Sequence, residues 1–214
     1  ALPVGNKGLV NDLSYFIVEN ERSARRFLRA WGYTRSFDEV EMYVLDKHLP
    51  RPDFHKFLEL WHEGHSIGLL SEAGCPCIAD PGSEVVAFAH LSGVTVVPLV
   101  WPSSILLALM GSGFNGQQFT FNGYLPIQKD ERAKKIKLLE TTVRQLGITQ
   151  IFMETPYRNN QLFMDLVTVL NPETRLCVAC DITLDSEWIK TQKISYWKNK
   201  MPDLNKRTSI FLLG

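Results

Sequence analysis

The chain has 214 residues, of which 45% are hydrophobic and 21% are charged, and its 23 basic side chains balance its 23 acidic ones. This composition argues against a disordered protein, a collagen-like repeat or a coiled coil, and it is typical of a globular chain with a sizeable core. The zero net charge also argues against a protein that binds duplex nucleic acid along an extended basic face. A small local phosphate site stays compatible with it.

The sequence shows neither a membrane span nor a charged leader followed by an apolar run, and its four cysteines are too few for a secreted disulfide scaffold. It opens without Met, so a few N-terminal residues are expected to be missing. We expect a cytoplasmic protein with no membrane partner. Cys177 and Cys180 lie in an apolar run, where an offset of three on a strand points side chains to opposite faces. Buried reduced thiols are therefore favoured over a zinc site, and no metal is expected.

The first half alternates short β-branched or aromatic runs with amphipathic helical stretches, which is the pattern of an α/β protein with a parallel sheet. One continuous apolar run, Ser-Ile-Gly-Leu-Leu-Ser, is typical of a strand buried on both faces. The predicted strands are residues 15–18, 41–45, 66–71 and 94–100, and the predicted helices are residues 23–31, 51–63, 83–91 and 104–110.

A segment rich in glycine, asparagine and glutamine, residues 111–118, is the predicted hinge between a first domain, 1–112, and a second domain, 113–214. Strands fall close together near the end of the chain, so the second domain is expected to contain a mixed sheet. The predicted fold class is therefore two α/β domains, the first with a mostly parallel sheet. Beyond the hinge, the predicted helices are 130–146 and 158–170, and the predicted strands are 149–154, 175–182, 187–194 and 209–213.

The most unusual stretch is Ser-Glu-Ala-Gly-Cys-Pro-Cys-Ile-Ala-Asp-Pro-Gly, residues 71–82. It follows a buried predicted strand, at the end where open α/β sheets place their ligand crevices. It lacks the glycine pattern and the lysine of a phosphate-binding loop, so it suits an uncharged or cationic part of a ligand. The alternative is a tight turn in which Asp80 caps a helix that begins at Pro81.

Two other predicted strand ends carry candidate residues. Trp101 and Pro102 lead into Ser103 and Ser104, and either serine is suited to cap a helix of small residues. The third strand end carries Phe-Met-Glu-Thr-Pro-Tyr-Arg, residues 152–158. Its glutamate and arginine form either a surface ion pair of little energetic value or part of a pocket.

Residues 71–82, the following Val-Val-Pro-Leu-Val-Trp-Pro-Ser-Ser run and the later Phe-Asn-Gly-Tyr-Leu-Pro segment resemble the tetrapyrrole methylase superfamily. They are most similar to its branch of small-subunit ribosomal RNA methyltransferases, which act on a cytidine ribose 2′-hydroxyl. The resemblance covers nearly the whole chain. It implies two α/β domains with S-adenosylmethionine (SAM) folded in a cleft between them, and a homodimer. Weaker landmarks in the right order are residues 3–6, 19–22, 154–158 and 179–183.

The resemblance also implies which residues hold SAM. The loops after two first-domain strands would line its methionine end, and residues of the second domain would cover its adenosine. The first set is Glu72, Ala73, Gly74, Cys75, Pro76, Pro102, Ser103 and Ser104, and the second set is Met153, Ile182 and Thr183.

Methyl transfer from a sulfonium is an in-line displacement, in which alignment and exclusion of water supply much of the acceleration. A ribose hydroxyl is a poor nucleophile and benefits from a base or a cation that lowers its pKa. The candidates are Glu19 as the base and Arg22 as an orienting or phosphate-contacting residue. Glu154 and Arg158 form a second candidate pair.

The chain departs from the branch pattern at several positions. Trp101 stands where a glycine usually precedes Pro-Ser-Ser, and Asn20 replaces an acid. Residues 46–48 match a His-containing acidic loop only in part, and residues 205–208 replace a Lys-Gly-Glu-like motif. The basic cluster 132–137 is a candidate contact for RNA phosphates, or otherwise a solvated helix face.

The leading hypothesis is a SAM-dependent methyltransferase acting on ribosomal RNA. One alternative is a methyltransferase acting on a tetrapyrrole or another small molecule. A second alternative is a catalytically silent SAM- or RNA-binding protein in which Trp101 fills the pocket.

Overall fold

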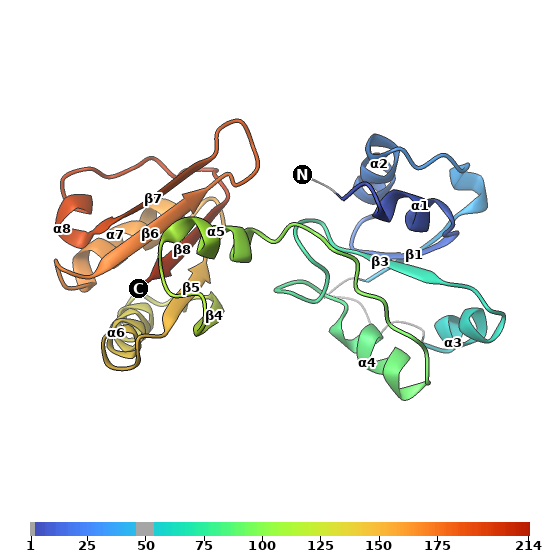
Figure 1. The fold of residues 1–214 in the computed structure, drawn as a ribbon, viewed down its shortest axis with the longest axis horizontal. Helices are drawn as coiled ribbons and strands as arrows, with labels where there is room; N and C mark the ends of the chain where they lie inside the picture. Colours follow the sequence, from blue (N-terminus) through green and yellow to red (C-terminus); the bar gives the residue numbers. More distant parts are fainter. Residues whose placement is uncertain (1–2, 46–53) are drawn as a thin grey trace. The chain divides into compact units, whose positions relative to one another are not determined.

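The computed structural model describes residues 3–45 and 54–214, so the predicted acidic-loop match at 46–48 lies outside the described residues. The chain divides into two compact units, Ala1–Pro102 and Ser103–Gly214, each with its own sheet and helices (Figure 1). The predicted α/β class with a parallel first sheet and a mixed second sheet is confirmed. None of the described helices is long and apolar enough to cross a membrane.

The first unit contains a three-stranded parallel sheet in the order β2-β1-β3, in which Tyr15 lies opposite both Glu41 and Ile67. Helices cover both of its faces. The strands are β1 (Tyr15–Val18), β2 (Glu41–Val44) and β3 (Ile67–Leu70), the helices are α1 (Asn6–Asn11), α2 (Glu21–Trp31), α3 (Phe54–His62) and α4 (Ser83–Leu91), and a 3-10 turn spans Phe37–Glu39.

The two faces of the first sheet follow the alternation of side chains along β1. Phe16 and Val18 are buried in a cluster with residues of α1 and α2. Ile17, between them, is buried in a second cluster with Phe57 of α3 and Val85 of α4. The sheet is therefore packed between two helical layers, as expected for parallel strands.

The prediction of a strand at residues 94–100 is wrong, because this segment pairs with neither the first nor the second sheet. Val97 and Val100 are 67% and 75% exposed. A β-branched sequence favours extended backbone, but a strand also needs a neighbour that offers backbone donors and acceptors.

The second unit contains a five-stranded mixed sheet in the order β4-β5-β8-β6-β7, in which only β4 and β5 are parallel. Its strands are β4 (Phe119–Tyr124), β5 (Thr149–Met153), β6 (Arg175–Cys180), β7 (Trp188–Lys193) and β8 (Ser209–Leu213). Its helices are α5 (Ser104–Ser112), α6 (Lys129–Leu146), α7 (Asn159–Val169) and α8 (Ile194–Trp197).

The core of the second unit also lies on both faces of its sheet. Cys180 is buried in the cluster that holds residues of α6 and α7, whereas Cys177 is buried in the cluster that holds residues of α5. This confirms that the two thiols point to opposite faces. Burial raises the pKa of the Cys177 thiol to about 11. The described residues contain no group of three or more side chains suited to hold a metal.

The boundary between the units lies between Pro102 and Ser103, ten residues before the expected one. The reason is the packing of α5 on the second sheet. A Cβ on Gly111 would lie 2.8 Å from Ile189 Cδ1, and the Thr191 hydroxyl donates to the Ser112 carbonyl at 2.6 Å. The start of the expected hinge is therefore packed within the second unit.

Candidate functional site

The unusual loop of residues 71–82 leaves the carboxyl end of β3, next to the end of β1. The Glu72 backbone N–H donates to Glu19 Oε1 at 3.0 Å, and the Ser23 hydroxyl donates to Glu72 Oε1. Neighbouring parallel strands end at the same edge of a sheet, and this geometry brings the Glu19 carboxylate to the backbone of Glu72. Two of the predicted site residues therefore meet in one hydrogen-bonded group.

Asn20 and Arg22 both lie at the start of α2. Asn20 is the N-cap of α2, and its Oδ1 accepts the Ser23 backbone N–H at 3.1 Å. Asparagine and aspartate cap helices almost equally well, so the replacement of an acid at this position preserves the helix start. Arg22 lies exposed in the first turn of the same helix, so the structure gives it no place beside Glu19 in the bonded group.

The second loop of the first unit approaches the first through Cys75. Its Sγ lies 3.9 Å from the Trp101 carbonyl oxygen and 4.0 Å from that of Pro102. The Trp101 indole packs against α2, with ring centroids 5.7 Å from Phe27 and 5.2 Å from Trp31. No described atom outside the adjacent residues lies within 4 Å of the position that a Cβ on Gly74 would take. The indole therefore does not fill the space beside Gly74.

The helix after this loop begins later than the capping alternative requires. α4 begins at Ser83, and Gly82 with φ +124° is its N-cap, so Pro81 is not the first helical residue. A Cβ on Gly82 would lie 2.7 Å from Leu69 Cδ2. The glycine is needed both for its backbone conformation and for its close approach to β3.

Backbone strain is concentrated in the loops that the sequence singled out. Among residues 3–45 and 54–214, five non-glycine residues have a positive φ: Cys77, Ala79, Asp181, Thr183 and Lys206. Each such residue costs on the order of 1–3 kcal/mol, and these conformations cluster at ligand sites. The first two lie in the loop after β3, the next two lie in the loop after β6, and Lys206 adjoins a residue that binds the latter loop.

In the second unit, the predicted SAM-contacting residues lie at one edge of the sheet. Met153 at the end of β5, Ile182 after β6 and Ile105 in the first turn of α5 pack in one apolar cluster. Ser103 is the N-cap of α5, without a hydrogen bond from its side chain, and Ser104 is its exposed first residue. The start of α5 therefore packs against the same buried cluster as Met153 and Ile182.

The loop after β6 is held by Arg207, which the sequence reasoning noted only as part of a lost motif. Arg207 Nε donates to Asp181 Oδ2 at 2.8 Å, and the Ser186 hydroxyl donates to the same oxygen at 2.9 Å. Burial alone would raise the pKa of Asp181, but these bonds outweigh it and hold the pKa below its usual value. The sequence marked residues 205–208 only as a departure from a Lys-Gly-Glu-like motif and did not predict this contact.

Glu154 and Arg158 form the predicted pair, but it is not a surface pair. Glu154 is only 6% exposed, and its Oε1 accepts from the Thr155 N–H at 2.7 Å and from Arg158 Nη2 at 2.6 Å. Arg158 Nε is buried and has no partner among the described residues. The pair therefore fixes the turn after β5 and leaves one buried guanidinium donor without a partner among the described residues.

Arg132, the first residue of the basic cluster 132–137, is not placed to contact phosphate. Arg132 is buried, where its Nε donates to Asp165 Oδ2 at 2.7 Å and its Nη1 donates to the Ile127 carbonyl at 2.6 Å. Its function is structural. Lys134 and Lys137 remain exposed on α6.

The chain is similar in sequence and in fold to known methyltransferases. No family model matches the chain. It is 30% identical over 196 residues to ribosomal RNA small subunit methyltransferase I of Vibrio cholerae, which covers 88% of this chain and 65% of that protein. It is 27% identical to the protein of the same name from Xylella fastidiosa, over 100% of this chain and 78% of that protein. A crystal structure of the methyltransferase CobJ shares the fold, with a TM-score of 0.63 and 14% identity over 100% of this chain and 87% of that chain.

The chain is therefore similar to small-subunit ribosomal RNA methyltransferases, and it has the fold of the methyltransferase CobJ. The resemblance found in the sequence is thereby confirmed, and the relatives carry the methyltransferase name that the predicted function requires. The chain spans just under two thirds of the Vibrio cholerae relative and about three quarters of the Xylella fastidiosa one.

The glycine with a positive φ in the loop after β3, Gly74, offers a direct test of that loop. Gly74 has φ +73°, a conformation that a β-branched residue adopts only at a cost of about 1–2 kcal/mol. We expect Gly74→Val to weaken SAM binding at least tenfold, measured by calorimetry, because the loop must change its backbone path. Gly147→Val, at φ +67° where α6 ends, is the matched control. It should cost similar stability and leave SAM affinity unchanged, and an equal loss of affinity in both variants would contradict the assignment.

Proposed function

We propose that this chain is a SAM-dependent methyltransferase that transfers a methyl group to a ribose 2′-hydroxyl of small-subunit ribosomal RNA. The observation that carries the proposal is the loop after β3, in which Cys77 and Ala79 have a positive φ. The Glu72 N–H of this loop donates to Glu19, and the space beside Gly74 is open. The names of the relatives in Vibrio cholerae and Xylella fastidiosa support the choice of RNA.

The residues present fit SAM. The loop from Glu72 to Pro76 offers backbone groups rather than a basic side chain, as a ligand with a positive sulfonium and an amino group requires. The Glu19 carboxylate, bound to the Glu72 N–H of this loop, favours positive charge on the ligand. In the second unit, Met153 and Ile182 present apolar surface suited to an adenine ring, and Thr183 lies in the strained loop beside them.

SAM supplies an electrophilic methyl group, so the chain has to align the acceptor, exclude water and manage one proton. Glu19 is assigned as the base for the ribose hydroxyl, since its Oε1 is held in place by the Glu72 N–H. Arg22, exposed on α2, is assigned to the phosphate backbone of the substrate. Glu154 holds Arg158, whose side chain is 40% exposed and is assigned to orienting the acceptor strand.

A ribosomal RNA substrate implies action in the cytoplasm, and the proposed active form is a homodimer. With Arg132 committed to the core, the local phosphate contacts are Arg22 and the exposed lysines Lys134 and Lys137. A dimer doubles the phosphate contacts of each unit, although the net charge of the chain is zero.

Two measurements test the proposal. Calorimetry should show binding of SAM and of its demethylated product S-adenosylhomocysteine. Ribose-methylation mapping of small-subunit RNA from a deletion strain should show one site lost, restored by the wild-type chain. Arg22→Ala should restore it at least tenfold less efficiently than Arg26→Ala, which removes another exposed arginine of α2. Absence of SAM binding would overturn the methyltransferase assignment. An unchanged methylation map with altered tetrapyrroles or other small molecules would overturn the RNA assignment.

A further inference from the structure

Positive charge is concentrated at one place in the chain. Five of its eleven arginines lie within the fourteen residues 22–35, and this stretch contains no acidic residue, although the charges of the whole chain balance. The stretch covers most of α2 and the turn that follows it. The first unit therefore carries a local basic surface that the net charge of the chain does not reveal.

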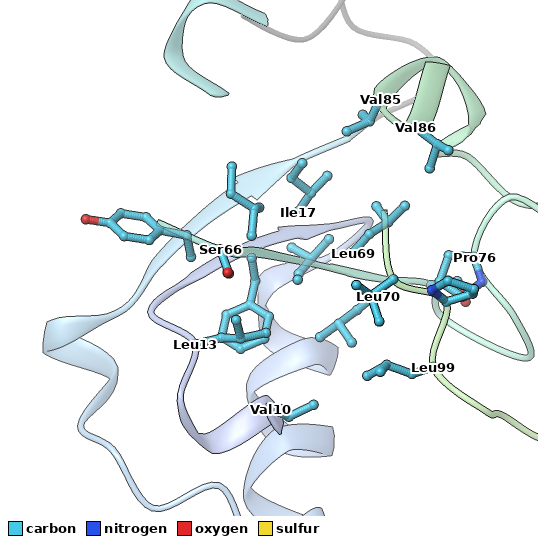
Figure 2. Close-up of a pocket in the computed structure, with 18 of the residues that line it drawn as sticks. Val10, Leu13, Ile17, Ser66, Leu69, Leu70, Pro76, Val85, Val86 and Leu99 are labelled. Atoms are coloured by element: carbon cyan, nitrogen blue, oxygen red, sulfur yellow. The ribbon is translucent and has the colours of Figure 1, made fainter. Parts of the chain in front are cut away.

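The apolar side of α2 packs within the first unit. Ala24 and Leu28 are buried in a cluster with residues of α1 and β1. Ala24 also borders a cavity of the first unit, whose lining includes Val10, Leu13 and Leu70, labelled in Figure 2. No arginine is among the described residues that line this cavity. The charged and apolar faces of α2 are therefore separate, and the arginines lie on the solvent side.

Four arginines share the solvent side of α2, and all are exposed: Arg22, Arg25, Arg26 and Arg29. At 3.6 residues per turn, Arg22 and Arg29 lie almost in line along the helix. Arg25 lies on one side of this line and Arg26 on the other side. Because a helix rises roughly 1.5 Å per residue, the stripe formed by Arg22, Arg25 and Arg29 is about 10 Å long.

The arginine stripe begins at the candidate site. Arg22 is next to Ser23, whose hydroxyl donates to Glu72 Oε1, and the Glu72 N–H donates to Glu19 at 3.0 Å. α2 follows β1 and packs on a face of the sheet, so it runs back from the carboxyl edge of the strands. The rest of the stripe therefore lies progressively farther from Glu19.

Phe37 orders two of the guanidinium groups. The guanidinium carbon of Arg29 lies 4.3 Å from the centroid of the Phe37 ring, and that of Arg25 lies 5.8 Å from it. Phe37 is itself stacked on Tyr33, with ring centroids 5.9 Å apart. Arg29 Nη1 also donates to the Tyr33 carbonyl oxygen at 2.7 Å. Binding through these side chains therefore loses less conformational entropy than binding through free arginines.

The positive charge of the stripe is only partly neutralised. Arg25 forms an ion pair with Glu21 at 2.9 Å, but neither Arg22 nor Arg29 forms one among residues 3–45 and 54–214. An ordinary solvated helix face places opposite charges four residues apart. α2 instead places arginines four apart twice, at 22 and 26 and at 25 and 29, which destabilises a helix by about 0.2–0.5 kcal/mol per pair. A bound polyanion removes this repulsion.

The chemistry of the stripe fits an RNA strand better than a membrane surface. A guanidinium group binds phosphate through two parallel hydrogen bonds, and its plane stacks on an unpaired base. A helix that binds a membrane surface inserts its apolar face. The apolar face of α2 is not free to do so, because Ala24 and Leu28 are buried against the sheet.

We propose that Arg22, Arg25 and Arg29, ordered by Phe37, bind the single-stranded stretch of ribosomal RNA that flanks the methylated nucleotide. The phosphates lie along α2, and the strand reaches Glu19 at the start of the helix. The inference rests on the proposed function and extends its RNA contact on α2 from one arginine to a surface about 10 Å long. Arg26, on the other side of the line and away from Phe37, is not part of it.

Affinity for small-subunit ribosomal RNA, measured by fluorescence anisotropy over a series of salt concentrations, tests the proposal. Arg25→Ala combined with Arg29→Ala should weaken binding at least tenfold. It should also reduce the slope of the logarithm of the binding constant against the logarithm of the salt concentration by about 1.4, since each contact with a single strand contributes about 0.7. Arg144→Ala combined with Lys198→Ala removes the same charge from exposed positions of the second unit and should weaken binding less than about threefold.

A charge-conserving variant separates stacking from charge. Arg25→Lys combined with Arg29→Lys keeps both positive charges, so the salt dependence should stay unchanged. It replaces the planar groups that Phe37 orders, so binding should weaken about three- to tenfold. Affinity equal to that of the wild-type chain would overturn the ordering by Phe37.

The outcomes also separate this surface from the proposed function. Full RNA affinity and full methylation in the Arg25→Ala and Arg29→Ala double variant would overturn the surface and leave the methyltransferase assignment in place. Equal losses in this variant and in the second-unit control would overturn it as well, since they would reflect net charge alone. A wild-type chain that binds SAM but no small-subunit RNA would overturn both the surface and the RNA substrate.

Discussion

Arg132→Ala is expected to lower the free energy of unfolding of the second unit by about 3–5 kcal/mol, because it leaves the buried Asp165 carboxylate without its cationic partner. Arg132 and Asp165 join α6 to α7 through a contact of 2.7 Å, and both residues are buried. The guanidinium also donates to the carbonyls of Pro126 and Ile127, so its loss leaves those acceptors with one donor fewer. Urea denaturation followed by circular dichroism measures the change.

Two further variants show whether the loss of stability comes from the unpaired Asp165 carboxylate. Arg25→Ala removes an ion pair of 2.9 Å with Glu21, but both side chains are nearly half exposed, so it should cost no more than about 0.5 kcal/mol. Arg132→Met combined with Asp165→Leu removes both charges and should recover most of the loss. A loss at Arg132→Ala no larger than that at Arg25→Ala would contradict this account.

Sequence periodicity predicted the elements whose burial is decided locally. The strands 15–18 and 209–213 and the helix 83–91 were predicted with the bounds that the structure has. In each of them the pattern of apolar residues and the neighbouring glycines or caps favour the same element. The loop after β3 was found for a related reason, since its position after an apolar strand marks the usual ligand edge of such a sheet.

Contacts between residues far apart in sequence were beyond such reasoning. Arg132 looked like a member of a basic helix face, and only the fold brings Asp165 to it. Arg207 was noted only as part of a departure from a family motif, and its hydrogen bond to Asp181 is seen only in the structure. The segment 94–100 failed for the complementary reason, because its sequence favours a strand but pairing depends on a neighbour that the described chain does not provide.

Glu19→Gln is expected to lower the rate of methyl transfer by about 10²–10⁴-fold while SAM affinity stays within about threefold. The amide oxygen of glutamine still accepts the Glu72 N–H, so the loop after β3 keeps its anchor. The amide takes no proton from a ribose hydroxyl, so the proposed base is lost. Single-turnover transfer to small-subunit RNA, with calorimetry of SAM binding, measures the two effects separately.

Glu19→Ala distinguishes the two functions of this carboxylate, because it removes the acceptor as well as the base. It should lose SAM affinity about tenfold further than Glu19→Gln, since the Glu72 N–H then has no side-chain acceptor in place. Glu21→Gln, on a nearby carboxylate that binds Arg25, should change neither quantity. Full activity in Glu19→Gln with impaired binding in Glu19→Ala would mean that Glu19 only positions the loop. The proton would then leave the ribose hydroxyl by another route, because alignment of the acceptor alone would suffice for transfer.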